Sequence, residues 1–310
     1  MKLPPLKALP VFEAVARLNS FSKAADELSI SQSAVSHQIK QLESYLGESL
    51  FIRTGRYLSL TEEGQQYQEA ISSALMQIER ASERLLGHET SRLRLSVFSS
   101  FAVRWLVPRL PELRRQYPQL ELSLEMTGEN PRLSDRVADC FITIKQSSPA
   151  FAYDLLYTER LFPVCSQAFW QRICREQQLD PAVDALSLEQ LASYPLLSTY
   201  SIYDRSAGDW EAWYAVADRA LPAEQPVQHF SHMLLALEAA RFDQGIALTN
   251  DYMLNPEHDA EDFVRLPCHS LITGDTFYFA WKLTRRHESS IQRLRHWLVQ
   301  QAIENGLRPS

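Results

Sequence analysis

Hydrophobic and polar positions repeat with a helical period between residues 31 and 46 and divide this predicted helix into two faces. The apolar positions are spaced three and four residues apart: Val35, Ile39, Leu42 and Leu46. A second stripe, on roughly the opposite side, holds short hydrogen-bonding groups and one cation: Ser33, Ser36, His37 and Lys40. Such a helix can bury one face and place the other in the major groove of DNA, where hydroxyl and imidazole groups meet base edges and an ammonium meets a phosphate.

The segment before this helix predicts a shorter helix over residues 22–28, with Ser22 as its N-cap and a packing face of small residues. Only three residues, Ser29 to Ser31, separate the two helices, and so tight a turn is typical of the helix-turn-helix motif. An earlier amphipathic helix over residues 6–18 completes a three-helix core, with Pro10 near its start, where a missing N–H is tolerated.

The segment after it, residues 50–60, predicts two short strands around a turn at Thr54 and Gly55. Arg53 and Arg56 flank this turn, as in a wing that places arginines over a minor groove or a phosphate backbone. The alternative is a small helical packing domain with ordinary surface polar residues, but the tight turn and the wing together favour DNA binding. The candidate DNA-binding residues are Ser22, Ser31, Gln32, Ser33, Ser36, His37, Lys40, Arg53 and Arg56.

Residues 6–64 resemble the DNA-binding region of the LysR-type transcriptional regulators and keep the spacing of that family. The matching residues are Ser20-Phe-Ser-Lys-Ala-Ala-Asp-Glu-Leu28, Ser31-Gln32, Ala34-Val35-Ser36-His37-Gln38-Ile39-Lys40, Leu42-Glu43, Leu46-Gly47, Leu50-Phe51, Arg53 and Leu60-Thr-Glu-Glu-Gly64. Many members have arginine at the position of His37; this histidine and the opening Leu3-Pro-Pro-Leu-Lys-Ala-Leu9 are similar to the glycine-cleavage-activator-like subgroup. The resemblance implies a dimeric or tetrameric bacterial regulator that binds double-stranded DNA, senses a small molecule through its C-terminal domain and has RNA polymerase as a further partner.

Length and charge restrict this interpretation. A chain of 310 residues suits two or three domains, and a hydrophobic share of 45% is enough for packed cores. The net charge is −7, and residues 1–90 hold nine lysines and arginines against eleven aspartates and glutamates. DNA binding must therefore rely on a local footprint, present twice in a dimer, with few phosphate contacts per subunit.

The four cysteines stand apart, at positions 140, 165, 174 and 268, without a C-x-x-C pair or a histidine cluster of metal-ligand spacing. We therefore expect no zinc site, no cofactor and a reducing compartment. The N-terminus lacks an apolar signal-peptide core, and no stretch is long and apolar enough to span a membrane. The sequence thus predicts a cytoplasmic protein without membrane contact.

A long helix is predicted from Thr61, its expected cap, to about residue 86, with a hinge after it. A seam of positions four and three residues apart runs along it: Tyr67, Ile71, Ala74, Ile78, Ala81 and Leu85. The helix either packs on its own domain or pairs with a second copy, and its length and regular seam favour a coiled-coil-like dimer contact. Two paired heads would enter the major groove one turn, about 34 Å, apart, which predicts a pseudo-palindromic operator.

The remaining residues predict a two-lobed α/β domain. Alternating strands and helices follow one another from residue 93, and this order implies right-handed crossovers and a parallel sheet. The predicted fold class is α/β, with an N-terminal winged helix-turn-helix, a long linker helix and a two-lobed periplasmic-binding-protein-like effector domain whose lobes are joined by two crossings of the chain. The expected domains are a DNA-binding domain at 1–60, a linker and dimerisation helix at 61–88 and an effector-binding domain at 89–310. Arg104-Trp-Leu-Val-Pro-Arg-Leu110 and the Trp210/Trp213 pair also resemble the LysR-type effector domain.

Ligands of such folds bind at the carboxyl ends of strands, beside helix N-termini. The candidate effector-binding residues chosen by this rule are Ser99, Ser100, Phe101, Thr127, Gly128, Thr199, Phe230 and Ser231. Their hydroxyl and N–H groups suit a carboxylate, although the serines could equally be simple helix caps. The apolar residues after them, Met233, Leu234 and Leu237, are expected in the core.

Other function classes fit less well. The chain has no G-x-S-x-G, no glycine-rich phosphate loop and no metal triad, which argues against an enzyme. A solute-binding protein of transport type would not need the N-terminal head, and a constitutive architectural DNA-binding protein would not need a two-lobed domain. The sequence therefore predicts a ligand-responsive transcriptional regulator with a carboxylate or amino-acid-like effector.

Overall fold

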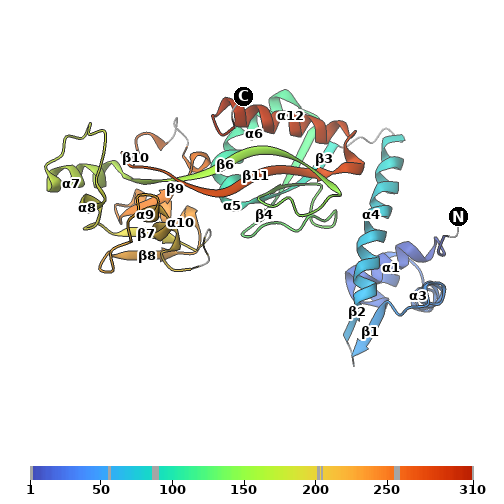
Figure 1. Cartoon of the computed structure of the whole chain (residues 1–310). Coiled ribbons are helices and arrows are strands. Elements are labelled where there is room, and N and C mark those ends of the chain that lie inside the picture. The colour runs from blue at the N-terminus through green and yellow to red at the C-terminus, as the bar shows by residue number, and fades with distance from the viewer. Residues whose placement is uncertain are drawn as a thin grey trace. The chain divides into compact units, whose positions relative to one another are not determined.

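The computed structural model describes residues 3–54, 57–85, 91–200, 203, 205–254 and 259–308. The chain forms two compact units, of which the first contains residues 1–90 and 134–138 and the second contains residues 91–133 and 139–310. Figure 1 labels most of the helices and strands of both units. No helix in the described part of the chain combines the length and the hydrophobicity that a membrane crossing needs.

The first unit has a helical core. Its described elements are α1 (Ala8–Leu18), α2 (Phe21–Glu27), α3 (Gln32–Leu46), the hairpin of β1 (Phe51–Thr54) and β2 (Tyr57–Leu60), and α4 (Glu62–Leu85). Buried side chains of α1, α2 and α3 form one cluster, and the apolar stripe predicted for α3 is confirmed by the burial of Val35, Ile39 and Leu42. Gly47 ends α3 in the left-handed conformation (φ 76°), which glycine adopts without strain.

Serine caps fix where α2 and α3 begin. The Ser20 hydroxyl accepts a hydrogen bond of 3.3 Å from the Lys23 N–H, and the backbone of Ser20 is extended. The prediction that Ser22 caps this helix is wrong, because Ser22 lies inside the first turn and its hydroxyl shares a 3.1 Å hydrogen bond with that of Ser20. Both serines suit a cap by residue type, and the backbone conformation decides between them.

The start of α4 is tied to the chain before the hairpin. Thr61 Oγ1 accepts a hydrogen bond of 2.9 Å from the Gly64 N–H and donates one of 2.9 Å to the Ser49 carbonyl, so Thr61 is confirmed as the cap. A Cβ on Gly64 would lie 2.2 Å from the Leu50 carbonyl oxygen. Glycine at this position therefore lets the first turn of α4 pack directly on the backbone that enters β1.

The second unit is a mixed sheet with helices on its faces. Its described elements are β3 (Ser91–Phe98), α5 (Ser99–Phe101), the π-helical turn η1 (Ala102–Leu106), α6 (Val107–Gln116), β4 (Leu120–Thr127), β5 (Cys140–Thr143), β6 (Phe151–Ser166), α7 (Gln167–Gln177), α8 (Leu188–Leu191), β7 (Leu196–Thr199), α9 (Gly208–Ala215), β8 (Val227–Phe230), α10 (Met233–Arg241), β9 (Ile246–Thr249), η2 (Asp251–Met253), β10 (Phe263–Arg265), β11 (Leu271–Lys282), η3 (Leu283–Arg285) and α12 (Ser289–Glu304). The strand order is β4-β3-β5-β11-β6-β9-β7-β8, and β10 also pairs with β6.

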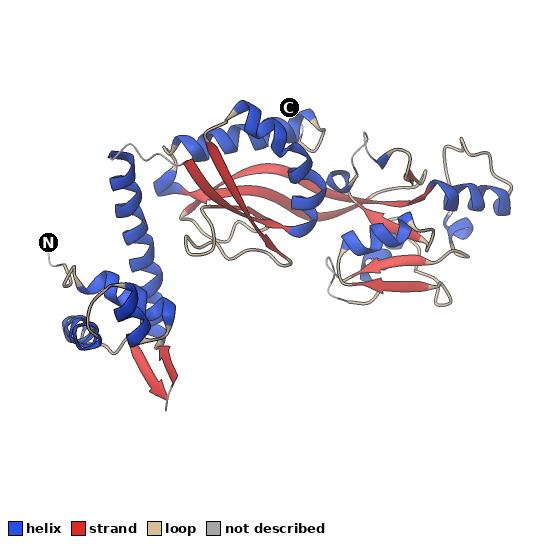
Figure 2. Ribbon diagram, turned by 180° about the vertical axis from the view of Figure 1, so that it is seen from behind, coloured by secondary structure: helices blue, strands red, loops and turns tan. Residues whose placement is uncertain are grey.

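Two lobes are recognisable in this unit. Lobe 1 is built on β3, β4 and β5, and lobe 2 on β7, β8 and β9; within each lobe these strands run parallel, as predicted. The sheet as a whole is mixed, because β6 and β11 are antiparallel to one another, β6 is antiparallel to β9, and β11 is antiparallel to β5. These two long strands carry the chain between the lobes, which confirms the two predicted crossings (Figures 1 and 2).

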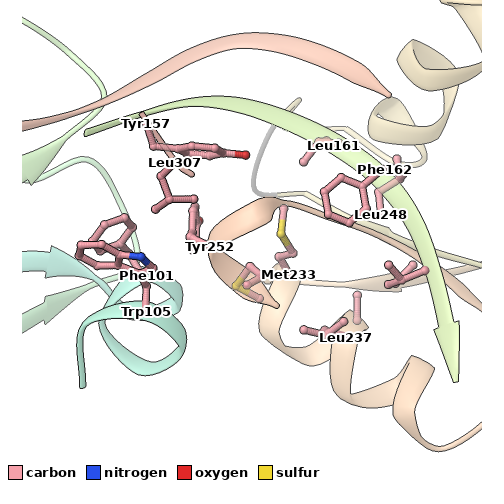
Figure 3. Close-up of a cluster of buried hydrophobic side chains, with 14 of the residues drawn as sticks. Phe101, Trp105, Tyr157, Leu161, Phe162, Met233, Leu237, Leu248, Tyr252 and Leu307 are labelled. Carbon is pink, nitrogen blue, oxygen red and sulfur yellow. The ribbon is translucent and has the colours of Figure 1, made fainter. Parts of the chain in front are cut away.

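A continuous hydrophobic core extends through both lobes. Figure 3 shows part of it, with Tyr252 drawn between the Phe101–Trp105 pair and Met233. The ring centroid of Phe101 lies 4.8 Å from that of Trp105 and 5.1 Å from that of Tyr252. These rings join η1 and α5 of lobe 1 to η2, so the segments that flank the crossing strands are packed together.

A buried ion-pair network fixes the end of β11 to lobe 1. Arg285 lies 3.0 Å from Asp139 and 2.6 Å from Glu288, and the side chains of Arg285 and Asp139 are each 4% exposed. Asp139 also accepts a 2.8 Å hydrogen bond from the Arg94 N–H of β3. The network thus links the last turn after β11 to the edges of β3 and β5.

Candidate functional site

The first candidate site is the outward face of α3. Gln32, Ser33, His37 and Lys40 are exposed there, and Ser36 is half-buried. The opposite face of the same helix supplies the buried stripe of the core. Hydroxyl, amide, imidazole and ammonium groups on one exposed helix face provide both donors and acceptors for base edges and a positive charge for phosphate.

The other predicted DNA-binding residues have more varied positions. Ser31 is the cap of α3: its hydroxyl accepts a 3.2 Å hydrogen bond from the Ala34 N–H and shares one of 2.9 Å with Ser33. Ser22 is exposed on the first turn of α2. Arg53 lies on β1, opposite Leu58 in the hairpin, whereas Arg56 lies outside the described residues.

The seam predicted on α4 divides into two parts. Tyr67 and Ile71 pack against the core of the first unit, and the Tyr67 ring lies 5.4 Å from that of Phe12. At these two positions α4 packs on its own unit, because the face of α4 that carries the predicted seam is also the face that contacts α1. Ala74 and Ile78 are exposed on α4; the side chains of the last two seam positions, 81 and 85, are not described.

The second candidate site is a cavity of about 360 Å³ between the lobes of the second unit. Its walls come from lobe 1, lobe 2 and both crossing strands: Phe98, Ser99, Ser100, Thr127, Gly128, Ile144, Glu159, His232, Met233, Leu234, Leu235, Tyr252, Asp275 and Phe277. A Cβ on Gly128 would lie 3.4 Å from His232 Nε2, so the lobes approach each other closely at this edge of the cavity. The volume is at the small end of the range for ligand sites in proteins.

Four of the predicted effector residues do line the cavity: Ser99, Ser100, Thr127 and Gly128. Ser99 Oγ donates a 3.2 Å hydrogen bond to the Thr127 carbonyl, and Ser100 Oγ shares one of 3.2 Å with the Tyr252 hydroxyl. Across the cavity stands the first turn of α10, which has no side-chain cap. Hydroxyl groups and a helix N-terminus therefore face one space from two sides.

The other four predicted effector residues are not among the lining side chains. Phe101 is fully buried among aromatic rings behind Ser100, because the helical turn rotates it toward Trp105. Thr199 is buried and its N–H donates a 2.9 Å hydrogen bond to Asp209, which fixes α9 on β7. Phe230 packs against the core, and Ser231 is exposed and bonded to His232 Nδ1 at 2.8 Å. Met233 lies in the core and Leu234 packs against it, as expected, and both also line the cavity.

Two carboxylates in the cavity wall were missed by sequence reasoning. Glu159 on β6 is 4% exposed and accepts hydrogen bonds from Asn250 Nδ2 (2.8 Å) and Thr273 Oγ1 (3.0 Å). Burial raises the pKa of Glu159 to about 7, and the charge of Asp275 adds to this effect. Burial also raises the pKa of Asp275, while Lys145 acts in the opposite direction.

A bulge in β11 brings these groups together. Ile272 is opposite Arg160 and Thr276 is opposite Thr158, so three residues of β11 face the single residue Glu159. Gly274, at the centre of the bulge, has φ +89°, which favours glycine. No short motif marks this arrangement; the only local signal is the Thr-Gly-Asp sequence inside an otherwise apolar strand.

No group of three or more histidine, cysteine, aspartate or glutamate side chains suited to a metal ion occurs among the residues described. Every described cysteine is a free thiol.

Family models match nearly the whole chain. Residues 6–65 match the bacterial regulatory helix-turn-helix protein family named for LysR, and residues 86–303 match the LysR substrate binding domain. The chain is 34% identical over 303 residues to the glycine cleavage system transcriptional activator of Escherichia coli K12, covering 97% of this chain and 95% of that protein.

Solved structures share the fold. ArgP from Mycobacterium tuberculosis has a TM-score of 0.68 at 22% identity, covering 97% of this chain and 98% of that one. Full-length LysG from Corynebacterium glutamicum, with bound effector arginine, has a TM-score of 0.64 at 20% identity, covering 98% and 99%.

Proposed function

Because the chain belongs to the LysR family of ligand-responsive transcriptional regulators, we propose that it binds a pseudo-palindromic operator with the α3 faces of two paired heads. The observation that carries this proposal is the division of α3 into a buried apolar stripe and an exposed polar face. In this proposal Ser36 and His37 read base edges, and Lys40 meets a phosphate.

The pairing of two heads in a dimer or tetramer is part of the same proposal. The exposed Ala74 and Ile78 on α4, continued by Ala81 and Leu85, supply the seam, since Ile78 is a large apolar side chain that is 63% exposed. RNA polymerase is proposed as a further partner, which the name of the E. coli relative as an activator supports.

The effector is proposed to be a small carboxylate or amino-acid-like molecule in the cavity between the lobes. The volume of about 360 Å³ and the hydroxyl groups of Ser99 and Ser100 support a small polar ligand. LysG, which shares the fold, carries arginine as its effector. Binding between the lobes would favour one arrangement of the regulator over another and so alter operator binding.

The experiment that tests DNA binding uses Lys40→Ala in the full chain, with Arg175→Ala as the control. Arg175 is an exposed cation on α7 in the second unit. Electrophoretic mobility shift on operators selected from a random library should show weaker binding of Lys40→Ala to every sequence and a salt slope reduced by about 1 per lost contact. Unchanged affinity of Lys40→Ala would contradict the phosphate assignment, and an equal loss in Arg175→Ala would show a general charge effect.

A further inference from the structure

Among the described residues neither carboxylate of the cavity forms an ion pair, and Glu159 has two hydrogen-bond donors. Glu159 accepts from Asn250 and Thr273, and among the described residues no ion pair joins Glu159 or Asp275 to lysine, arginine or histidine. The described residues that line the cavity include neither lysine nor arginine. A buried carboxylate that lacks a counter-charge must either hold a proton or receive a cation from outside.

The groups that face Glu159 from the surrounding elements reinforce this requirement. They are Asp275 on β11, Tyr157 on β6, Tyr252 on η2 and Tyr203 before α9. None of them is a cation, and burial or the nearby negative charge raises the pKa of each tyrosine, so each phenol remains neutral. The exposed Lys145, two residues after the end of β5, acts on Asp275, and His232 lies on the opposite wall of the cavity.

We propose that Glu159 and Asp275 form an ammonium subsite, so that the effector is a small α-amino acid whose protonated amine faces this pair while its carboxylate faces Ser99 and Ser100. This inference rests on the proposed function, since it specifies the ligand of the same cavity. A monocarboxylate without an amine would bring no positive charge to the two acidic groups and would add a further negative charge to the cavity.

The subsite also couples binding to a proton. In the empty cavity, protonated Glu159 avoids the cost of a buried charge; when R–NH₃⁺ enters, the ammonium replaces the proton as the partner of the carboxylate. The balanced step is R–NH₃⁺ plus Glu159–COOH giving the R–NH₃⁺···⁻OOC–Glu159 pair plus H⁺ released to solvent. Affinity for amino acids should therefore rise as the pH increases from about 6 to about 8.

The test compares ligands that differ only in the amine, using the full-length protein. Glycine, alanine and serine (both enantiomers of the latter two) are paired with glycolate, lactate and glycerate in thermal-shift and calorimetric titrations. At least one amino acid should bind, and its hydroxy-acid partner should not. Calorimetry at pH 7 in two buffers of different ionisation enthalpy should show release of a fraction of a proton per ligand, because burial raises the pKa of Glu159 to about 7.

Neutral variants of the two acids complete the test. Glu159→Gln keeps an acceptor oxygen but no charge, and should weaken amino-acid binding on the order of 30-fold and abolish proton release. Asp275→Asn, at a half-buried position, should weaken binding on the order of 5-fold. Glu125→Gln, an exposed acid on β4 outside the cavity, should bind as the unaltered protein does. Thermal unfolding of each variant checks that it is folded.

The outcomes separate this inference from the proposed function. Equal binding of amino and hydroxy acids, or unchanged affinity in both Glu159→Gln and Asp275→Asn, would leave a ligand-binding regulator but overturn the ammonium subsite. Failure of every amino acid to bind, in protein that still shifts its operator, would also overturn it. Absence of sequence-preferring operator binding would overturn the proposed function itself.

Discussion

The outward face of α3 and the cavity of the second unit hold polar groups in opposite environments. Lys40 and His37 are exposed on α3, where the Lys40 charge needs no partner, and both are proposed to contact DNA. Glu159 is removed from water, so its charge state depends on what enters the cavity. In our proposals, the first site acts through the shape and position of its exposed surface, and the second acts through the cost of burying a charge without a counter-charge.

Two groups of arginine ion pairs, one buried and one exposed, show the same contrast between environments. Replacing the buried arginine should have the largest effect on stability of the changes considered. Arg285→Met should lower the free energy of unfolding of the second unit by about 3–5 kcal/mol, because Asp139 and Glu288 lose their buried partner. Arg17, paired with Glu13 and Glu27 on the surface of the first unit, should be replaceable by Met with little change. Chemical denaturation measures both, with the exposed Arg286→Met as the control; similar losses in all three would refute the distinction.

The buried carboxylate should also leave a signature in the stability of the ligand-free protein. Since the pKa of Glu159 is raised to about 7 in the folded state, its contribution is fully present below about pH 4 and is lost as the pH rises through 7. The unfolding free energy of the unaltered protein relative to Glu159→Gln should fall by about 3 kcal/mol between pH 4 and pH 8. Parallel pH profiles of the two proteins in urea denaturation would show that Glu159 carries a normal pKa.

On the exposed face of α3, the side chains proposed to read bases should affect sequence preference. Ser36→Ala and His37→Ala should each change the preferred base at one operator position by about 1–3 kcal/mol. Selection from a randomised operator library measures this preference. If a variant instead binds every operator sequence more weakly by the same factor, as expected for Lys40→Ala, its side chain contacts the DNA backbone and not a base edge.

The smallest effect expected is that of a helix cap in the same unit. Ser20→Ala should lower the free energy of unfolding by about 1 kcal/mol, because the Lys23 N–H loses its acceptor. Ser22→Ala, two residues away, should change stability far less, since Ser22 is inside the helix. Thermal denaturation of the two variants distinguishes them, and a larger loss in Ser22→Ala would contradict the assigned start of α2.

Much of the first unit is predictable from the sequence because its information is local. The spacing of Val35, Ile39 and Leu42 on one continuous helix determines which face is buried, and the opposite face follows from geometry alone. Thr61 is likewise identifiable as a cap from its place before two glutamates. Local information was insufficient where two candidates had similar chemistry, as with Ser20 and Ser22.

In the second unit, the sequence determined the parallel strands of each lobe and the serine-rich wall after β3, because each follows from a short alternating pattern and the strand-end rule. Only the tertiary structure decided that β6 and β11 run antiparallel between the lobes and that Glu159 and Asp275 face the same cavity. These two residues are 116 positions apart in the chain, and a bulge of three residues opposite one brings them together. Periodicity does not encode the pairing of distant strands, and burial of a charge becomes visible only once the groups around it are in place.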